Sequence, residues 1–408
     1  MKPSLKKLLV IGHTFPESST TAAGSRMMQL ISMFQKREWK ITFATSAMQT
    51  PYSENLSLHG IAIEHTYLND VVFDDFIKDL QPDVVIFDRF ITEEQFGWRV
   101  AEYVPNAIRV LDTEDLHFLR KAREEAVKSN FEVPHLYTEL AKREIGSILR
   151  SDLALIISET EMKLLTDTFQ VPKDLLWYLP FLLDATTNES ATYEMRRHFM
   201  TIGNLKHAPN ADSVMILKKL WPEIRRRLPD TECHVYGNYA SNKILNLSNP
   251  SEGFLIKGWA PNLKEVMQKY QVLLAPLRFG AGLKGKIIDG FQFGLPVVTT
   301  SIGAEGISGN FDFGGVIAEL EDFSKAAVEL YSNEMMWNNC QNKGYQILEK
   351  RFQKKLFEND FFNKIEALSV TLENHRNKHF IGQILHYNLY QRTKFMSKWI
   401  MEKHKNQS

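Results

Sequence analysis

Residues 275–306, APLRFGAGLKGKIIDGFQFGLPVVTTSIGAEG, give the strongest fold signal in this chain. An apolar run just before them, Gln271–Ala275, predicts a buried strand, and the two spaced glycines that follow predict a tight loop. Apolar residues at helical spacing then predict a helix over Lys284–Phe293, and Leu295–Thr299 predicts the next buried strand. This order of strand, loop, helix and strand is typical of a parallel α/β sheet.

The loop and the start of the predicted helix have the chemistry of an anion site. Gly280 and Gly282 have no side chains, so backbone N–H groups at the helix start can approach a phosphate. Lys284 and Lys286 add positive charge, and Asp289, about one turn later, offers a carboxylate to hydroxyl groups. The stretch therefore predicts a site for a phosphorylated ligand that is rich in hydroxyls.

The same block resembles a known family signature. The donor-site block of group-1 (family 4) glycosyltransferases of GT-B architecture is similar, in order and spacing, to Pro276-Leu277-Arg278, Gly280-Ala281-Gly282, Lys284, Lys286, Asp289 and Gly294-Leu295-Pro296-Val297-Val298. The resemblance implies an α/β fold in which two Rossmann-like domains face each other across a cleft, followed by a C-terminal helical tail. It also implies transfer of a sugar from a nucleotide-sugar donor to a hydroxyl acceptor.

Composition is that of an ordinary globular protein. The chain has 408 residues, of which 44% are hydrophobic, and equal numbers of basic and acidic side chains, 49 of each. A formal net charge of zero does not indicate a polyanion partner, so we expect no nucleic acid among its partners. The two cysteines, Cys233 and Cys340, form neither a disulfide framework nor a metal-ligand pattern, which favours a cytoplasmic location. No apolar run approaches about 18 residues, so we expect no spanning helix.

Alternating strands and helices form two series. The first series predicts a parallel sheet from apolar runs at Leu8–Gly12, Ile41–Ala44, Val84–Phe87, Ile108–Leu111 and Leu153–Ile157. A second series begins near His198, and the short polar stretch Leu183–Thr192 between them is typical of a linker. We therefore predict an N-terminal domain over 1–185 and a donor-binding domain over 195–355. C-terminal helices follow over 356–408, and the resemblance implies that their first part crosses back to the N-terminal domain.

The loop after the first predicted strand contains candidates for donor binding, because ligands of open parallel sheets bind beyond the carboxyl ends of the strands. Gly24 precedes a helix predicted to begin at Ser25, so its N–H group is a candidate for the donor diphosphate. The alternative is a turn with a helix cap. Arg26 is a second candidate for the donor, and its alternative is a solvated arginine.

A dense set of ionisable residues, LDTEDLH over 111–117, follows the strand predicted at Ile108–Leu111. Asp112, Asp115 and His117 are the catalytic candidates in this set. His117 can bond a sugar hydroxyl or help to move the acceptor proton, and relatives carry a histidine or an acidic residue on this loop. The alternatives are a helix cap for Asp115 and a surface or capping position for His117.

Strand ends of the second domain contribute two more donor-binding candidates. Gly203 ends a predicted strand, and the next residue, Asn204, stands where many family members carry an arginine for the donor phosphates. Lys284 and Lys286 are therefore expected to supply most of the phosphate charge. Glu305 follows the strand predicted at Leu295–Thr299 and is a candidate for contact with the nucleotide or sugar, with helix capping as its alternative.

The resemblance implies a retaining mechanism without a metal or another cofactor. Helix N-termini and cations stabilise the diphosphate leaving group in such enzymes, and no Asp-x-Asp or His-rich cluster is evident in the sequence. The expected acceptor is a saccharide or a lipid-linked saccharide, in glycan or cell-surface polysaccharide biosynthesis. Two alternatives stay open: a non-catalytic nucleotide-sugar-binding subunit of a transferase complex, and a GT-B nucleotide-sugar epimerase or hydrolase.

The C-terminal tail, Leu372–Ser408, has a composition of its own. Basic residues outnumber acidic ones, and apolar residues recur at nearly helical spacing. Such a helix is a candidate for peripheral contact with the cytoplasmic face of a membrane that bears anionic or polyprenyl-linked lipids. The alternative is a helix that packs back on the protein.

Overall fold

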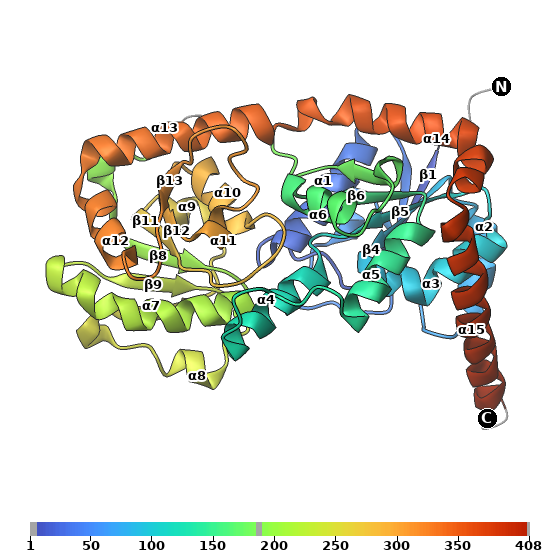
Figure 1. The fold of residues 1–408 in the computed structure, drawn as a ribbon, viewed down its shortest axis with the longest axis horizontal. Coiled ribbons are helices and arrows are strands. Elements are labelled where there is room, and N and C mark those ends of the chain that lie inside the picture. Colours follow the sequence, from blue (N-terminus) through green and yellow to red (C-terminus); the bar gives the residue numbers. More distant parts are fainter. Residues whose placement is uncertain (1–5, 185–189, 406–408) are drawn as a thin grey trace.

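The computed structural model describes residues 6–184 and 190–405, without the side chains of residues 389–393, 404 and 405. Two α/β domains lie side by side, and a pair of helices in line runs along both of them (Figure 1). Part of the predicted linker, residues 185–189, falls outside the described residues, as do the two chain ends. The predicted fold class, two parallel sheets flanked by helices, is confirmed.

The N-terminal domain is a seven-stranded sheet of order β3-β2-β1-β4-β5-β6-β7 in which all neighbouring strands are parallel. Apolar clusters cover both of its faces. Its elements are β1 (Lys7–Gly12), α1 (Ala22–Gln35), β2 (Lys40–Thr45), η1 (Leu56–His59), β3 (Ala62–His65), α2 (Val72–Leu80), β4 (Val84–Asp88), α3 (Arg89–Tyr103), β5 (Ile108–Asp112), α4 (His117–Ser129), α5 (Glu139–Arg150), β6 (Leu153–Ile156), α6 (Glu159–Asp167), η2 (Lys173–Leu175) and β7 (Leu176–Tyr178).

The C-terminal domain repeats this plan with a six-stranded parallel sheet of order β10-β9-β8-β11-β12-β13. The helix predicted after the glycine loop, at Lys284–Phe293, is α10 (Gly285–Gln292), which is one residue shorter at each end. The elements of this domain are η3 (Tyr193–Met195), β8 (Arg197–Ile202), α7 (Ala208–Arg227), β9 (Cys233–Tyr236), α8 (Asn242–Leu245), η4 (Pro250–Glu252), β10 (Phe254–Gly258), α9 (Leu263–Met267), β11 (Tyr270–Ala275), α10 (Gly285–Gln292), β12 (Val297–Thr299), α11 (Ser301–Ala304), β13 (Gly315–Ile317), α12 (Phe323–Ser332) and α13 (Glu334–Arg351).

The sequence predicted the central strands and missed edge strands. The five strands predicted for the first domain are present, and each end lies within one residue of its predicted position. These strands are buried on both faces, so they are continuous apolar runs that are easy to detect. The edge strands β3 and β7 were missed because they are short and partly exposed, and so have no such run.

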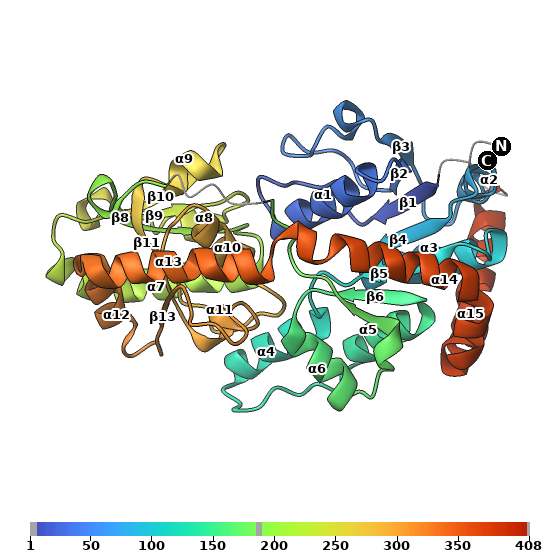
Figure 2. The same ribbon diagram turned by 90° about the horizontal axis from the view of Figure 1, so that it is seen from above.

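The chain crosses between the domains twice at one place. Leu183, which leaves the first domain, pairs with Gln353, which returns to it. The N–H of Leu183 donates to the Phe352 carbonyl over 2.8 Å, and the N–H of Lys354 donates to the Leu183 carbonyl over 2.8 Å. The returning segment continues through η5 (Lys354–Leu356) into α14 (Glu358–Lys378), so that α13 and α14 span the length of both domains (Figure 2).

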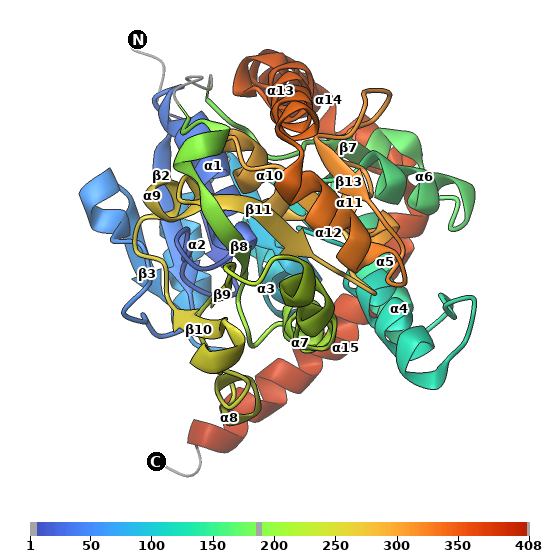
Figure 3. The ribbon, with the colours of Figure 1, turned by 90° about the vertical axis from the view of Figure 1, so that its left-hand side faces the viewer.

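The C-terminal helices pack on the N-terminal domain. In α14, Phe361, Ile365 and Leu368 are almost fully buried at helical spacing and join the core under the first sheet. After a break at residue 379, α15 (Phe380–Lys405) turns away from the direction of α13 and α14, which Figure 3 shows nearly end-on, and contacts α3 and α5. In the described part of the chain, no helix is both long enough and apolar enough to cross a membrane.

We predict that Phe361→Ala lowers the free energy of unfolding by about 3–5 kcal/mol, because it removes a fully buried ring and leaves a cavity. Phe380→Ala is the matched control, since that ring is 64% exposed, and its effect should stay within about 0.5 kcal/mol. Denaturant titration of both variants measures the difference. Equal losses would show that α14 does not contribute to the N-terminal core.

Candidate active site

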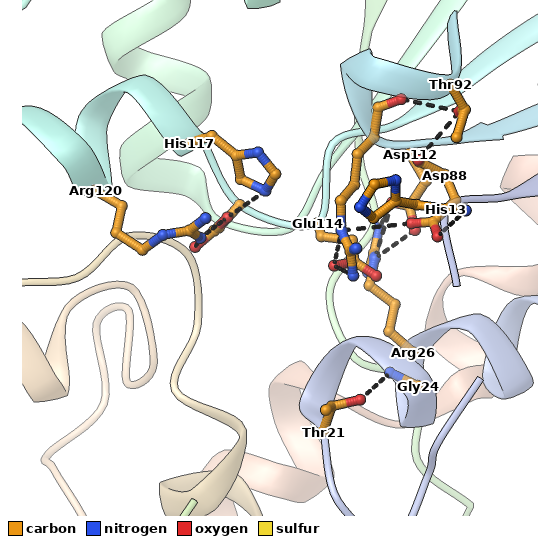
Figure 4. A network of polar contacts seen from close by, with 12 residues as sticks. His13, Thr21, Gly24, Arg26, Asp88, Thr92, Asp112, Glu114, His117 and Arg120 are labelled. Carbon is orange, nitrogen blue, oxygen red and sulfur yellow. Dashed lines mark hydrogen bonds and ion pairs between the residues drawn. The ribbon is translucent and has the colours of Figure 1, made fainter. Parts of the chain in front are cut away.

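A cavity of about 500 Å³ lies between the two domains. The first domain lines it with the start of α1 and the loop that leads into α4, and Figure 4 shows this side of the cavity. The second domain lines it with the loop after β8 and with residues 277–289. Predicted site residues that line the cavity are Arg26, Asp115, His117, Gly203, Lys284, Lys286 and Asp289. Gly24, Asp112, Gly282 and Glu305 lie behind its wall.

The glycine loop of the second domain lies directly against the first domain. The N–H of Gly282 donates to Glu161 Oε1 over 2.8 Å, so this N–H is bound by a carboxylate of α6. A Cβ on Gly282 would lie 2.7 Å from the Cβ of Asp115, and one on Gly285 would lie 2.6 Å from the Cβ of Ala22. Both glycines are therefore needed for close approach of the domains.

Two buried amines stand at the start of α10. Lys284 Nζ donates to the carbonyls of Ala281 and Gly282 over 3.2 and 2.7 Å, and Lys286 Nζ donates to Asn210 Oδ1 over 2.8 Å. Burial lowers the pKa of Lys284 to about 8 and that of Lys286 to about 7. Among the described residues, neither amine forms an ion pair. A bound anion would supply the missing negative charge and raise both pKa values.

Asp289 follows on the cavity-facing side of α10. Burial raises the pKa of its carboxyl to about 7. Its position one turn after Lys286 agrees with the expected contact with ligand hydroxyls, since carboxyl oxygens accept hydrogen bonds in either protonation state.

The opposite wall is formed by His117, Asp115 and Arg120. His117 is the first residue of α4, and its Nε2 lies 3.4 Å from Asp115 Oδ1 (Figure 4). Burial lowers the pKa of His117 to about 3, so the ring is neutral at physiological pH. Burial alone would raise the pKa of Asp115, but the Arg120 guanidinium and His117 outweigh it and hold this pKa well below its ordinary value. The pair therefore offers a neutral imidazole beside a charged carboxylate.

The start of α4 is capped by residues that the sequence did not reveal. Leu116 is the N-cap residue of α4, and its side chain forms no capping hydrogen bond. Asp115 lies one residue earlier and is therefore not the helix cap. Instead, Glu144 of α5 accepts hydrogen bonds from the N–H groups of His117 and Phe118, over 3.1 and 2.9 Å. Burial raises the pKa of Glu144 to about 8. This carboxyl fixes the position of His117, and only the packing of α5 against α4 brings it there.

Arg26 and Asp112 form a buried ion pair that the sequence did not predict. Arg26 Nε donates to Asp112 over 2.9 Å, and Nη2 does so over 2.8 Å. Arg26 Nη1 donates to the carbonyls of Leu179 and Pro180. Asp112 is fully buried, and that burial raises its pKa. All three guanidinium nitrogens of Arg26 therefore donate hydrogen bonds within the protein. Asp112 does not line the cavity. Both residues support the cavity floor.

Gly24 also has a role other than the predicted one. The helix begins at Ala22, earlier than expected, and the N–H of Gly24 donates to the capping side chain of Thr21 over 2.9 Å. A Cβ at Gly24 would lie 2.4 Å from the backbone of Glu17. Gly24 therefore allows a close backbone approach, and its neighbours Ala22, Ala23 and Ser25 line the cavity.

The side chain of Glu305 is also held in an ion pair. It forms a two-pronged ion pair with Arg123 of α4, over 2.7 and 2.8 Å, and Arg123 also donates to the Gly280 carbonyl over 2.8 Å. The pair bridges the two domains behind the glycine loop. Gly203 does line the cavity, and the carbonyl of the next residue, Asn204, accepts a hydrogen bond from the Asn210 amide over 2.9 Å.

Two strained residues pair at the floor of the cavity. Arg89 and Glu114 both have positive φ, at 71° and 60°, at the ends of β4 and β5. Their side chains form an ion pair over 2.7 Å. Burial raises the pKa of Glu114 to about 8. Strain of this kind persists where the surroundings fix the backbone, and it concentrates at functional sites.

Sequence comparison supports the resemblance stated for the glycine-loop block. Residues 196–333 match the family of group 1 glycosyl transferases, which confirms that resemblance for the second domain. No curated protein matches the chain with significant sequence similarity.

Solved structures of glycosyltransferases share the whole fold. A TarM variant from S. aureus, in complex with fondaparinux, alpha-GlcNAc-glycerol and UDP, has a TM-score of 0.70 at 9% identity, over 88% of this chain and 100% of its own. The pneumococcal O-GlcNAc transferase GtfA, with UDP and GlcNAc, scores 0.70 at 12% identity, over 90% and 99%. HepE from Anabaena, with UDP and glucose, scores 0.65 at 12% identity, over 89% and 100%. The predicted GT-B architecture is thereby confirmed.

We predict that Asp112→Asn lowers the free energy of unfolding by about 3–5 kcal/mol, because it leaves the buried Arg26 charge without its counter-ion. Glu223→Gln is the control, since its pair with Arg227 is exposed and should contribute less than about 1 kcal/mol. Denaturant titration compares the two. An Asp112→Asn protein of unchanged stability would contradict the supporting role given to this pair.

Proposed function

We propose that the protein is a retaining, metal-independent glycosyltransferase that moves a sugar from a nucleotide-sugar donor to a hydroxyl acceptor. The observation on which this rests is the pair of buried amines, Lys284 and Lys286, at the start of α10 in a cavity shared by both domains. A helix N-terminus and two cations match the charge that develops on a diphosphate leaving group.

The geometry suggests how the two domains divide the reaction. The second domain holds the diphosphate through Lys284 and Lys286, and Asp289 bonds hydroxyls of the donor. The first domain faces the transferred sugar with His117, whose neutral ring can donate or accept a hydrogen bond. In a retaining reaction of this kind, an oxygen of the leaving phosphate takes the proton of the attacking hydroxyl, so no protein nucleophile is needed. The closed cleft limits competing attack by water.

Structural neighbours suggest which ligands to test first. The three described above were solved with UDP, together with GlcNAc, glucose or a GlcNAc-glycerol compound. We therefore propose a UDP-sugar as donor and a saccharide or lipid-linked saccharide as acceptor, in glycan or cell-surface polysaccharide biosynthesis.

The deciding experiment incubates the purified protein with isotope-labelled UDP-glucose and UDP-GlcNAc, with and without a panel of glycan acceptors. Transfer of label to an acceptor with retained configuration, undiminished by a metal chelator, is the expected result. Release of free labelled sugar alone would favour a hydrolase, and an altered sugar on the nucleotide would favour an epimerase. Binding without turnover for every donor would favour a non-catalytic subunit.

We predict that Lys284→Met and Lys286→Met each weaken UDP binding by about 10- to 100-fold, the range expected for one lost hydrogen bond to a charged group. Lys325→Met is the matched control, because this exposed lysine lies on α12 away from the cavity, and it should bind UDP normally. Calorimetric titration with UDP provides the affinities. If both cavity variants bind UDP as tightly as the unmodified protein, the phosphate site is elsewhere.

We also propose that α15 lies on the surface of an anionic membrane. Its exposed aromatic side chains, Phe380, Tyr387, Phe395 and Trp399, are each at least 64% exposed, and Lys398 and Lys403 lie beside them in the sequence. Such a position would bring the cavity near lipid-linked acceptors.

We predict that replacing Phe395 and Trp399 together by aspartate reduces cosedimentation with anionic vesicles by about 10-fold or more, since both rings lose their apolar contact with the lipid. Phe131→Asp is the control, because that ring is equally exposed, at 70%, but lies after α4. Unchanged sedimentation of the double variant would remove α15 from the membrane contact.

A further inference from the structure

Three side chains with metal-ligand chemistry meet away from the cavity. Asp174 belongs to η2 of the N-terminal domain, and His375 and His379 stand one turn apart at the end of α14. One ligand atom of each lies within 4.8 Å of the others. None of the three lines the cavity between the domains. The cluster is therefore separate from the proposed donor site.

His379 is the most unusual member of this cluster. Its side chain is only 9% exposed, and its Nε2 has no hydrogen-bond partner within the described chain. This atom lies 3.2 Å from Asp174 Oδ2 without the geometry of a hydrogen bond. Buried polar nitrogens are rarely left in this state, because the lost hydration is not replaced. The unpaired ring nitrogen therefore lies beside a carboxylate oxygen, so the two atoms can bind one shared ion.

The ring of His375 is held by a hydrogen bond to a backbone carbonyl, as the rings of metal-bound histidines often are. Its Nε2 lies 2.8 Å from the carbonyl oxygen of Asp152, and since a carbonyl only accepts, Nε2 carries the proton. Nδ1 is then the free ligand atom. A backbone carbonyl that binds the second ring nitrogen is the usual outer-shell support of a metal site.

Asp174 supplies the negative charge. Its Oδ2 lies 3.2 Å from His379 Nε2 and accepts a hydrogen bond from Lys378 Nζ over 2.5 Å. Lys378 is the competing partner for this carboxylate. Its side chain is 70% exposed, so it can turn into solvent at small cost when a cation binds.

We propose that Asp174, His375 and His379 bind one divalent transition-metal ion, for which Zn²⁺ is the best match. Two imidazoles and one carboxylate are a common zinc donor set, with water in the fourth position of a tetrahedron. The ion would join η2 of the N-terminal domain to the end of α14, at the break before α15. Its role would be structural, because it fixes the returning helix to the domain and lies away from the cavity.

The test uses the full-length protein after removal of metals with a chelator. Competition with a chromophoric zinc indicator should give one tight site per chain, and Co²⁺ should show the visible absorption of tetrahedral coordination. Zn²⁺ should also raise the unfolding temperature by mass action. His375→Ala, His379→Ala and Asp174→Ala should each weaken Zn²⁺ binding by at least about 100-fold, since even loss of an outer-shell partner costs 10- to 100-fold.

Two control variants separate this site from others. His59→Ala removes an exposed histidine elsewhere and should leave Zn²⁺ affinity unchanged. Lys378→Ala removes the competing amine and should leave the affinity equal or tighter. If an alanine variant does not fold, His375→Gln and His379→Gln, which keep a polar side chain, replace it. Absence of a one-equivalent site, or equal affinity in the ligand variants and in His59→Ala, would overturn the proposal.

Discussion

One buried carboxylate joins the two domains behind the cavity. Glu161 Oε1 accepts hydrogen bonds from the N–H of Leu116, over 3.0 Å, and from the N–H of Gly282, over 2.8 Å. It therefore joins the loop that leads into α4 to the glycine loop of the second domain. Burial raises its pKa to about 7. The same contact requires a residue without a side chain at position 282, because Asp115 occupies the adjacent space.

This contact also distributes charge unevenly between the two cavity lysines. The attraction of Glu305 and Glu161 partly offsets the effect of burial on the pKa of Lys284, whereas burial alone acts on Lys286. The direct partner of Lys286 is the uncharged amide of Asn210. Lys286 therefore has less local charge compensation than Lys284. The two residues look equivalent in the sequence, and only the second domain's contact with α4 and α6 distinguishes them.

The local parts of the fold could be predicted, and the long-range pairings could not. The glycine loop and α10 were placed within one residue because apolar spacing and glycines are short-range signals. Arg26 and Asp112 are 86 positions apart, and they meet only because the sheet places α1, which follows β1, near the end of β5, two strands away, so each alone resembled a ligand-binding residue. Arg123 and Glu305 meet only when the domains close. Polar residues at strand ends predict a site, but folding decides which of them stay available to a ligand.

Opening of the cleft is constrained by where the chain crosses between domains. Leu183 and Gln353 lie side by side, so both crossings share one place, and α14 beyond them is fixed in the N-terminal core by Phe361. Apolar side chains of both domains, among them Ile157 and Leu283, pack in one buried cluster. Polar contacts accompany them: Glu161 with Gly282, Arg123 with Glu305, and Arg351 with Glu159 over 2.6 Å. Water can replace such contacts more readily than it can enter an apolar core. Both crossings and the buried start of α14 therefore join the two domains at one place, beside these polar contacts.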